Sequence, residues 1–414
     1  MAQVAPARVS APGHRVVLTA FIGILYWTAH TMIRPLVGPE VIAQGGSANL
    51  ASITLAAFAV LPTIVAIPIG SFTDRIGSRR MLVVGTILMI GGGLLLATPT
   101  GLPGLVLSQV VAGVGTLMAW VSLQATITAS GGDESPDRRN ARLATFSLYL
   151  AAGQALGPLL GGLLAEAYGR SAAFAAFTGL SSVLLVLAFF SQGPTRREVS
   201  EASSWREAVS SYPAAARLGR RPVVGVAVVV SFTALVGLDL RNAFVPLLLG
   251  PLGYDAGEIG VVLSVAAAAA FCSRPFFPWA MRRLSPAAMV GLVLGVAALS
   301  GIAFAAVSSF PALLAVAGVH GFALGFAQPL TLAMMADYTA PGERGLGSGL
   351  RSMANRAAQF ANPAVMGAAT AVGGLTAGFV AVGAGTVAVT GWCIWRLGRR
   401  PPGPLHPVDD QIDP

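Results

Sequence analysis

The sequence predicts an all-α membrane protein with twelve transmembrane helices in two pseudo-symmetric halves of six helices each. Three observations support this prediction: an apolar composition, regularly spaced apolar runs and an internal repeat. Of the 414 residues, 55% are hydrophobic and only 10% are charged, and the mean hydropathy is +0.73. A water-soluble chain of this length would need far more polar surface, so the composition indicates a membrane protein.

The apolar runs have the length of membrane-spanning helices. A helix needs about 20 apolar residues to cross the hydrocarbon core. Runs of this length and continuity favour helices over a membrane β-barrel. The twelve expected spans are residues 16–37, 50–71, 81–99, 104–127, 144–167, 172–191, 222–248, 256–278, 287–306, 311–336, 348–371 and 374–395. An even number of spans places both termini on the same side of the membrane.

The arginines indicate which side that is. All 26 basic residues are arginine, and most fall in the loops and tails of one side. Arg170 falls in a loop of the other side. Basic loops favour the cytoplasmic side, so both termini are expected there. This rule also accounts for the net charge of +9, and a nucleic-acid partner is therefore not expected.

The longest loop divides the chain into two halves. We expect an N-terminal bundle over residues 1–191, a cytoplasmic linker over 192–221 and a C-terminal bundle over 222–398. A proline-rich tail over 399–414 is expected to be disordered. Within the linker, residues 200–209 could form a short interfacial helix around Trp205, although a simple tether is the preferred interpretation.

The two halves also repeat one another. Arg34 and Arg241 are 207 residues apart, and so are Pro68 and Pro275. Later in each half the offset becomes 205, which aligns Gln154 with Gln359. A near-constant offset of half the chain length indicates duplication of a six-helix unit. Such parallel repeats place a substrate site near the bilayer midplane, where the halves meet.

A charged loop over residues 70–80 separates the second and third spans. Its six characteristic residues are Gly70, Asp74, Arg75, Gly77, Arg79 and Arg80. Glycine permits a tight turn, and the arginines hold the loop in the cytoplasm. The pattern resembles, at every position, the signature loop of the major facilitator superfamily. That resemblance covers essentially the whole chain and implies its fold and alternating access, with these residues acting in a cytoplasmic gate.

The loop that corresponds to this one in the second half, residues 275–286, has Met281 in place of the acid. A gate that uses the acid would therefore depend on Asp74 alone. In the family this acid is associated with the start of the eleventh span, which here is near Gly347 and Gly349.

The fifth span carries small residues at four-residue spacing together with a proline. Gly153, Gly157 and Pro158 begin this row, and Gly161 and Gly162 continue it. Small residues allow close helix packing, and proline bends a helix. The row resembles the antiporter motif of the drug–proton antiporter branch and would act in gating, although plain close packing also explains it. The fourth span departs from that branch, because Gln109 stands where an arginine is usual.

Polar and aromatic residues within the spans are candidates for a central site, because charges in hydrocarbon usually face a cavity. Substrate-binding candidates come from the first, fourth, seventh, tenth and eleventh spans. They are Tyr26, His30, Arg34, Trp120, Gln124, Arg241, Asn242, Gln328, Asn355, Arg356 and Gln359. Trp27 and His320 are further polar or aromatic residues in these spans. The two cysteines, Cys272 and Cys393, are expected to be buried packing residues.

Three charged residues within the spans, Arg34, Arg241 and Asp239, have two interpretations each. Arg34 and Arg241 resemble the arginine pair of organophosphate–phosphate antiporters, which would bind an anion from both halves. They could instead extend toward water near the span ends. Asp239 is the candidate proton carrier, because burial disfavours its charged form. It could equally be the counter-ion of Arg34 or Arg241.

Together these features predict a secondary transporter, not an enzyme, that couples efflux of a small organic compound to protons by antiport. Exchange of phosphate- or carboxylate-bearing organic anions through Arg34 and Arg241 is the alternative, and a transporter-like membrane sensor is a third possibility. We expect a monomer in a bacterial inner membrane. Its partners would be a small-molecule substrate, a proton or counter-solute and lipids, with no metal and no cofactor.

Overall fold

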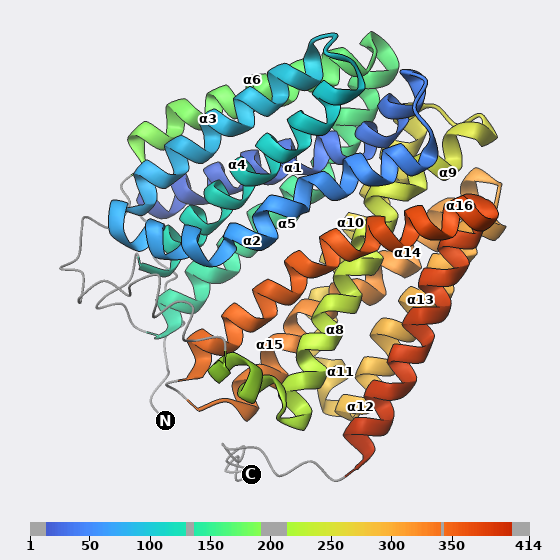
Figure 1. Cartoon of the computed structure of the whole chain (residues 1–414). Helices are drawn as coiled ribbons and strands as arrows, with labels where there is room; N and C mark the ends of the chain where they lie inside the picture. Colours follow the sequence, from blue (N-terminus) through green and yellow to red (C-terminus); the bar gives the residue numbers. More distant parts are fainter. Residues whose placement is uncertain (1–13, 130–135, 192–212, 341–342, 400–414) are drawn as a thin grey trace, which may run out of the picture.

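The computed structural model describes residues 14–129, 136–191, 213–340 and 343–399. These residues form helices and connecting turns, and none of them lies in a strand. Figure 1 shows the helices in two groups, one coloured blue to green and the other lime to red. The first group is the N-terminal half of the chain and the second is the C-terminal half. The all-helical prediction is confirmed for the described chain. Residues 200–209 and residues 400–414 of the predicted tail lie outside the described residues.

The N-terminal half consists of long, nearly uninterrupted helices. They are α1 His14–Ala43, α2 Ala48–Ile76, α3 Ser78–Ala97, α4 Gly101–Ala129, α5 Pro136–Tyr168 and α6 Arg170–Phe190. Local signals set several ends. The Ser47 hydroxyl accepts a hydrogen bond from the Leu50 amide at 3.2 Å and thereby caps α2. Gly77 separates α2 from α3 with a φ of +89°, a conformation that glycine adopts at no steric cost.

The C-terminal half contains more interrupted helices. A short helix over residues 213–219 precedes the first span of this half. That span joins α8 Pro222–Asp239, the π-helix η1 Leu240–Phe244, α9 Val245–Leu249 and η2 Gly250–Leu252. The next joins α10 Ala256–Ser273, η3 Arg274–Phe276 and α11 Phe277–Arg283. After these come α12 Pro286–Val290, η4 Gly291–Gly295, α13 Val296–Ala306, α14 Phe310–Gly325, α15 Ala327–Tyr338 and α16 Arg344–Gly398.

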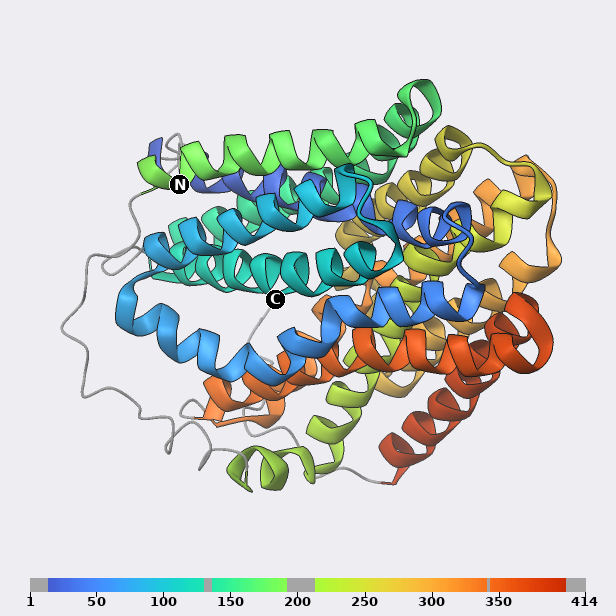
Figure 2. The same ribbon diagram turned by 45° about the horizontal axis from the view of Figure 1, so that its top comes forward.

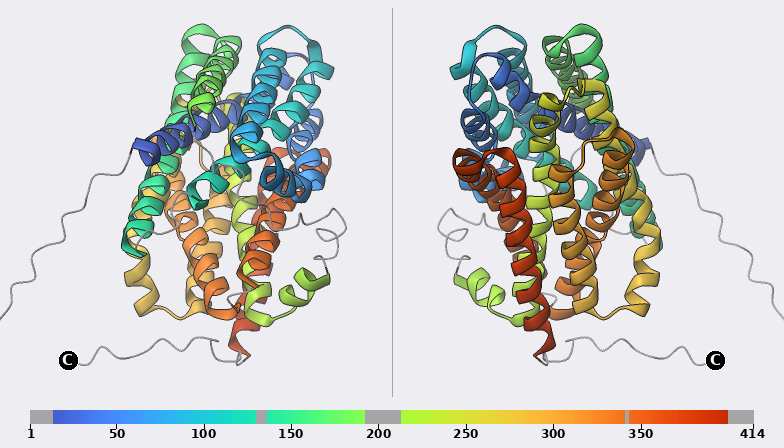
Figure 3. Two further views of the ribbon diagram at one scale, coloured as in Figure 1. Left: turned by 90° about the vertical axis from the view of Figure 1, so that its left-hand side faces the viewer. Right: turned by 90° about the vertical axis from the view of Figure 1, so that its right-hand side faces the viewer.

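Helix α16 contains both of the last two predicted spans. Its backbone leaves the helical conformation at Gly373 and Gly374, where Gly374 has a φ of +76°. The chain reverses direction at this point, as the red helices in Figure 3 show. By length and composition, ten helical segments of the described chain could cross a membrane, and the last of these is Gly349–Gly398. The chain is thus a multi-pass membrane protein, and the count of twelve stays a prediction.

Two pairs of helices pack against each other across the halves, and α1 also contacts η1 and α9. Helix α5 packs against α10, and α2 packs against the first part of α16. Figures 1 and 2 show α2 and α16 side by side along part of their length and farther apart toward the C-terminal end of α2. A Cβ atom placed on Gly367 of α16 would stand 3.1 Å from the Cβ atom of Ser52, near the beginning of α2. These two helices thus make a close contact near the α1–α2 connection, and the Thr63 hydroxyl donates to the carbonyl oxygen of Arg356 at 3.4 Å farther along α2.

One sequence expectation about packing was wrong. Cys393 is buried in the C-terminal half, but Cys272 is exposed near the C-terminal end of α10. An outward-facing position in a membrane helix needs only an apolar side chain, and cysteine meets that requirement as a small hydrophobe. The apolar run around Cys272 therefore identified the helix without identifying the inward face.

Candidate functional site

A buried ion pair joins the two halves at their interface. Arg34 of α1 donates from Nε to Oδ1 of Asp239, the last residue of α8, at 2.8 Å. A second nitrogen of the same guanidinium, Nη2, also bonds this oxygen. Arg34 is 7% exposed and Asp239 is 4% exposed. A charge in hydrocarbon is costly unless it is paired or faces a cavity, so this geometry stabilises both side chains.

The third member of this cluster, Asn362, comes from the eleventh predicted span. Its Nδ2 donates to the other carboxylate oxygen, Oδ2 of Asp239, at 3.0 Å. Both oxygens of Asp239 therefore have donors from other elements, one from α1 and one from α16. The sequence left open whether Asp239 neutralises Arg34 or Arg241, and among the described contacts its ion-pair partner is Arg34.

The second arginine lies in the π-helix that follows Asp239. Arg241 is 3% exposed, and its Nε donates to Oδ1 of Asn242 at 3.1 Å. A π-helical turn is uncommon and often occurs at functional sites, where it changes which side chains face a cavity. Here Asp239, Arg241 and Asn242 all line one cavity.

That cavity has a volume of about 70 Å³ and lies between the halves. Both halves supply charged or polar walls. The lining residues are Trp27, His30, Thr31, Arg34, Gln154, Pro158, Leu235, Leu238, Asp239, Arg241, Asn242, Leu263, Ala267 and Gln359. Among the described residues that line the cavity, Asp239 is the one acidic residue. Arg34 and Arg241 both line this cavity, and their binding of a substrate stays a prediction.

Several polar atoms at this cavity have no hydrogen-bond partner in the structure. They are Nε1 of Trp27, Nδ1 of His30, Nη1 of Arg34 and Nη1 of Arg241. Most buried polar groups in proteins are satisfied by protein or by water. The presence of four unpartnered polar atoms around one cavity therefore distinguishes the cavity from an ordinarily packed core.

Aromatic rings pack beside the cavity. Tyr26 stacks on Trp120 with ring centroids 5.9 Å apart, and Trp27 meets Trp120 edge-on at 5.3 Å. The Tyr26 hydroxyl donates to the carbonyl oxygen of Thr116 at 2.9 Å. The Arg34 guanidinium lies 5.2 Å from the centre of the Phe58 ring. Tyr26 and Trp120 thus support Trp27 from behind and do not themselves line the cavity.

Besides Tyr26 and Trp120, four predicted binding residues are absent from the cavity lining. Gln124 on α4 and Gln328 on α15 are exposed. Asn355 accepts a hydrogen bond from the Ser231 hydroxyl at 2.8 Å, which ties α16 to α8. Arg356 donates from Nη1 to Oε1 of Gln359 at 3.1 Å, so it reaches the cavity only through that amide.

Other residues at the site were not among the sequence candidates. Asn362, Thr31 and Gln154 belong to this group. The repeat did carry a signal for Gln154, because it aligns with Gln359, and both amides line the cavity. Asn362 carried only a weak signal, as one amide in an apolar helix before Pro363.

His320 has a supporting position in the C-terminal half. Its ring nitrogens lie 2.9 Å from the Ser300 hydroxyl and 3.2 Å from the carbonyl oxygen of Gly237. It is 1% exposed and does not line the cavity. These two contacts tie α14 to α13 and to the end of α8, two residues before Asp239.

Comparison with known proteins decides the family. The family model described as Major Facilitator Superfamily matches residues 19–307 and 242–412. The chain belongs to the major facilitator superfamily. Among curated proteins, the MFS-type transporter ppzB of Metarhizium rileyi is 28% identical over 137 residues, which is 32% of this chain and 26% of that protein. The ppzB protein of Metarhizium majus is 26% identical over 137 residues, which is 32% of this chain and 28% of that protein. The chain thus matches only about a quarter of the length of these fungal relatives.

Solved structures show the same superfamily fold at low identity. The nucleoside transporter NupG gives a TM-score of 0.77 at 11% identity, with 92% of this chain and 100% of that chain covered. A peptide transporter, POT, in complex with sulfate gives 0.75 at 15% identity, with 93% and 94% covered. A bacterial homologue of the lysosomal transporter Spinster gives 0.68 at 17% identity, with 92% and 96% covered. These structures therefore show that the described chain has the superfamily's fold.

The superfamily signature loop has the turn that its glycine predicts. Gly77 adopts the positive φ described above, and Arg79 and Arg80 are exposed in the first turn of α3. Gly70, Asp74 and Arg75 belong to α2, but the side chains of Asp74 and Arg75 lie outside the described part of the structure. Gly347 packs near Met335 and Thr339. The gate role of Asp74 stays a prediction.

The glycine row of α5, which resembles the superfamily's antiporter motif, has two packing partners. A Cβ atom on Gly153 or Gly161 would stand 2.5 Å from a carbonyl oxygen of α1, that of Ile24 or Met32 respectively. A Cβ atom on Gly162 would instead stand 3.0 Å from Cα of Gly260, in α10 of the other half. Gly157 faces α1, and Pro158 lines the cavity. The row therefore packs α5 both within its own half and across the interface.

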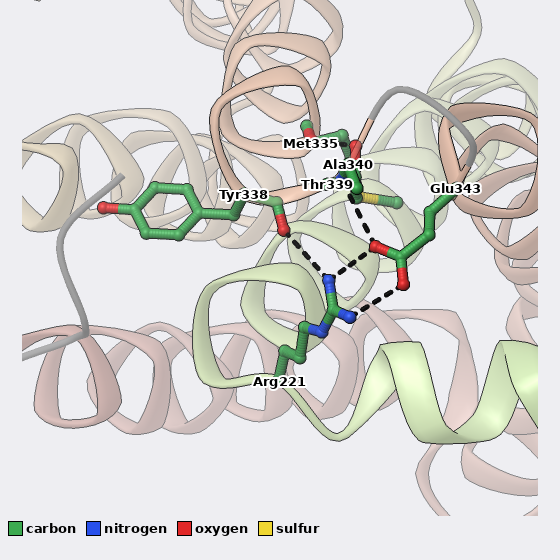
Figure 4. Close-up of polar contacts among 6 residues, drawn as sticks. All are labelled: Arg221, Met335, Tyr338, Thr339, Ala340 and Glu343. Atoms are coloured by element: carbon green, nitrogen blue, oxygen red, sulfur yellow. Dashed lines mark hydrogen bonds and ion pairs between the residues drawn. The ribbon is translucent and has the colours of Figure 1, made fainter. Parts of the chain in front are cut away.

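A second ion pair of the protein lies away from the cavity. Arg221, directly before α8, donates from Nη1 and Nη2 to the two carboxylate oxygens of Glu343, each at 2.7 Å (Figure 4). Nη1 also reaches the carbonyl oxygen of Tyr338 at 3.5 Å, and Glu343 accepts from the Ala340 amide at 3.2 Å. The hydrogen bonds from Arg221 hold the pKa of Glu343 below its ordinary value. This contact ties the start of α8 to the connection between α15 and α16.

Proposed function

We propose that this protein is a proton-coupled secondary active transporter that moves a small organic compound by alternating access between two six-helix halves. The observation that carries the proposal is the buried Arg34–Asp239 ion pair at the interface of the halves. An acid that holds an arginine of the other half links its own protonation to the contact between the halves. The expected orientation, with both termini in the cytoplasm, belongs to the same proposal.

The coupling step follows from the charges. When Asp239 is ionised, it binds Arg34 of α1 and Asn362 of α16 at once. Protonation removes the negative charge that neutralises Arg34, so the pair loses most of its Coulomb attraction. The cost of leaving Arg34 buried without a counter-ion then favours a rearrangement of α1 against α8. Proton binding at Asp239 would in this way change the relative stability of the two access states.

Efflux by proton antiport is the form that we favour. The glycine row of α5 supports it, because the row resembles the antiporter motif and packs against α10 at the interface between the halves. Exchange of organic anions is the second candidate. It is favoured by the presence of Arg34 and Arg241 in one cavity, and it does not require Asp239 to change protonation state.

The decisive experiment compares Asp239→Asn with the matched control Asp337→Asn, since Asp337 is an exposed acid at the end of α15. A thermal-shift screen of anionic, neutral and cationic compounds on the purified protein selects compounds to test in proteoliposomes. Asp239→Asn should abolish pH-gradient-driven accumulation and keep compound exchange, whereas the control should transport normally. Concentrative transport driven by a pH gradient in Asp239→Asn would refute the coupling role.

A further inference from the structure

We infer that the central cavity binds the oxyanion headgroup, a carboxylate or a phosphate, of an organic compound through Arg241, Arg34 and Trp27. This inference rests on the proposed function, because it names the substrate class of the same cavity. The binding mode differs from a clamp formed by two free arginines in one respect. Arg34 keeps its pair with Asp239 and offers the ligand only its remaining nitrogen.

The unpartnered atoms indicate which ligand chemistry the cavity favours. Nη1 of Arg34, Nη1 of Arg241 and Nε1 of Trp27 are hydrogen-bond donors and cannot accept. Nδ1 of His30 donates or accepts according to its tautomer. The ligand that satisfies this wall must therefore supply at least three acceptor positions. A carboxylate or phosphate provides them on one compact group.

The carboxylate of Asp239 and the amide oxygens of Asn242 and Gln359 already accept hydrogen bonds at this cavity. Both carboxylate oxygens of Asp239 accept from Arg34 and Asn362. Oδ1 of Asn242 accepts from Arg241. Oδ1 of Asn362 has no partner, but Asn362 does not line the cavity. Among the lining side chains, the amide of Gln154 is left as an acceptor for a cationic ligand, whereas three unpartnered donor nitrogens are available to an anion.

The charges lead to the same ligand class. Arg34 and Asp239 neutralise each other, so Arg241 leaves one positive charge among the groups that line the cavity. Arg356 adds a further positive charge behind Gln359. No acid other than Asp239 lines the cavity within the described residues. A monoanion would therefore neutralise Arg241, which otherwise stays buried without a counter-ion.

The aromatic wall suggests an apolar body next to the headgroup. Trp27 lines the cavity, and Tyr26, Trp120 and Phe58 pack close by. Ligand sites commonly combine an apolar wall with a few placed polar groups. The preferred compound would then carry its charge at one end of an apolar or aromatic body.

Benzoate, benzyl alcohol and benzylamine share a ring and differ in headgroup charge, so they serve as probes. Their affinities are measured by titration calorimetry on the purified protein in nanodiscs of phosphatidylcholine, which supply no anionic lipid headgroup as a competitor. Benzoate should bind at least about tenfold more tightly than the other two, because hydrogen bonds to charged groups are the stronger ones. Phenyl phosphate then tests whether phosphate and carboxylate share the site.

Two variants test which residues bind benzoate, and a third is their control. Arg241→Gln should weaken benzoate about tenfold or more, and Trp27→Phe, which keeps a ring but removes the donor, should weaken it severalfold. Arg282→Gln, an exposed arginine in the last turn of α11, is the matched control and should bind normally. If Arg241→Gln does not fold, Trp27→Phe and Arg241→Lys still report on the loss of donors.

The inference is overturned if benzylamine binds as tightly as benzoate, if benzoate does not bind at all, or if benzoate binding is unchanged in well-folded Arg241→Gln or Trp27→Phe. These readouts need no ion gradient. A protein that fails the pH-gradient experiment can therefore still show the preference for benzoate, and an active proton-coupled transporter can still lack it. The two proposals fail separately.

Discussion

At the scale of single residues, the two ion pairs serve different purposes because they differ in exposure. The side chains of Arg221 and Glu343 are 44% and 33% exposed, so water and salt screen their attraction. Those of Arg34 and Asp239 are 8% and 3% exposed, which makes their interaction strong and their separation costly. The buried pair is suited to couple the protonation of Asp239 to the contact between the halves. The exposed pair suits a positional tie between the start of α8 and the α15–α16 connection.

The exposed pair predicts a pH-dependent stability. The folded-state pKa of Glu343 lies below its ordinary value of 4.5. Its contribution is therefore present above about pH 4.5 and is lost as the pH falls through the lower folded-state value. Glu343→Gln should melt below the wild type at pH 7 in thermal-shift measurements, and this difference should vanish in strong acid. An equal difference at both pH values would contradict the assignment.

The residues of the site were only partly predictable from the sequence. Charges such as Arg34, Asp239 and Arg241 stand out in apolar spans because hydrocarbon excludes them, so their importance was visible. The sequence offered Arg34 and Arg241 as partners of Asp239 but did not decide between them, because the π-helix after Asp239 sets the direction of these side chains. Asn355 was predicted to bind substrate, but its side chain accepts a hydrogen bond from Ser231. The rotation of a helix about its axis decides which side chains face the cavity, and residue spacing alone does not reveal that rotation.

At the scale of helices, the sequence predicted the spans better than their irregularities. Run length located most spans to within several residues, but the π-helices η1 and η4 left no composition signal. The glycine row of α5 shows how one pattern can have two partners. Gly157 packs on α1 of its own half, and Gly162 packs on α10 of the other half.

Alanine substitutions should separate these two roles. A Cβ atom on Gly157 would stand 2.7 Å from the carbonyl oxygen of Thr28, so Gly157→Ala should destabilise the N-terminal half by about 1–3 kcal/mol. Gly162→Ala should slow transport more than it lowers the melting temperature, because it hinders closure between the halves. Gly179→Ala has open space around it and is the control. Equal effects of Gly157→Ala and Gly162→Ala on both melting temperature and transport rate would argue against this division.

At the scale of the whole molecule, the contact near the α1–α2 connection should open and close during transport. Ser52 and Gly367 belong to different halves, and their Cβ positions are 3.1 Å apart. Disulfides usually join Cβ atoms about 3.5–4.5 Å apart, so a small shift permits the bond. Ser52→Cys with Gly367→Cys, in a Cys272→Ser, Cys393→Ser background, should stop transport after oxidation and recover it with a reductant. Each single cysteine variant is a control, and full transport by the oxidised double variant would mean that the halves do not separate here.

The buried ion pair also has a consequence for how the chain is made. Arg34 and Asp239 are 205 residues apart, so a ribosome completes the first six helices long before the acid exists. During that interval Arg34 lies in a finished half without its counter-ion, at a cost of several kcal/mol if it is buried. The N-terminal half expressed alone should therefore be short-lived in the membrane, and co-expression of the C-terminal half should rescue it. The coupling residue of the mature transporter would then also act as a check on its assembly.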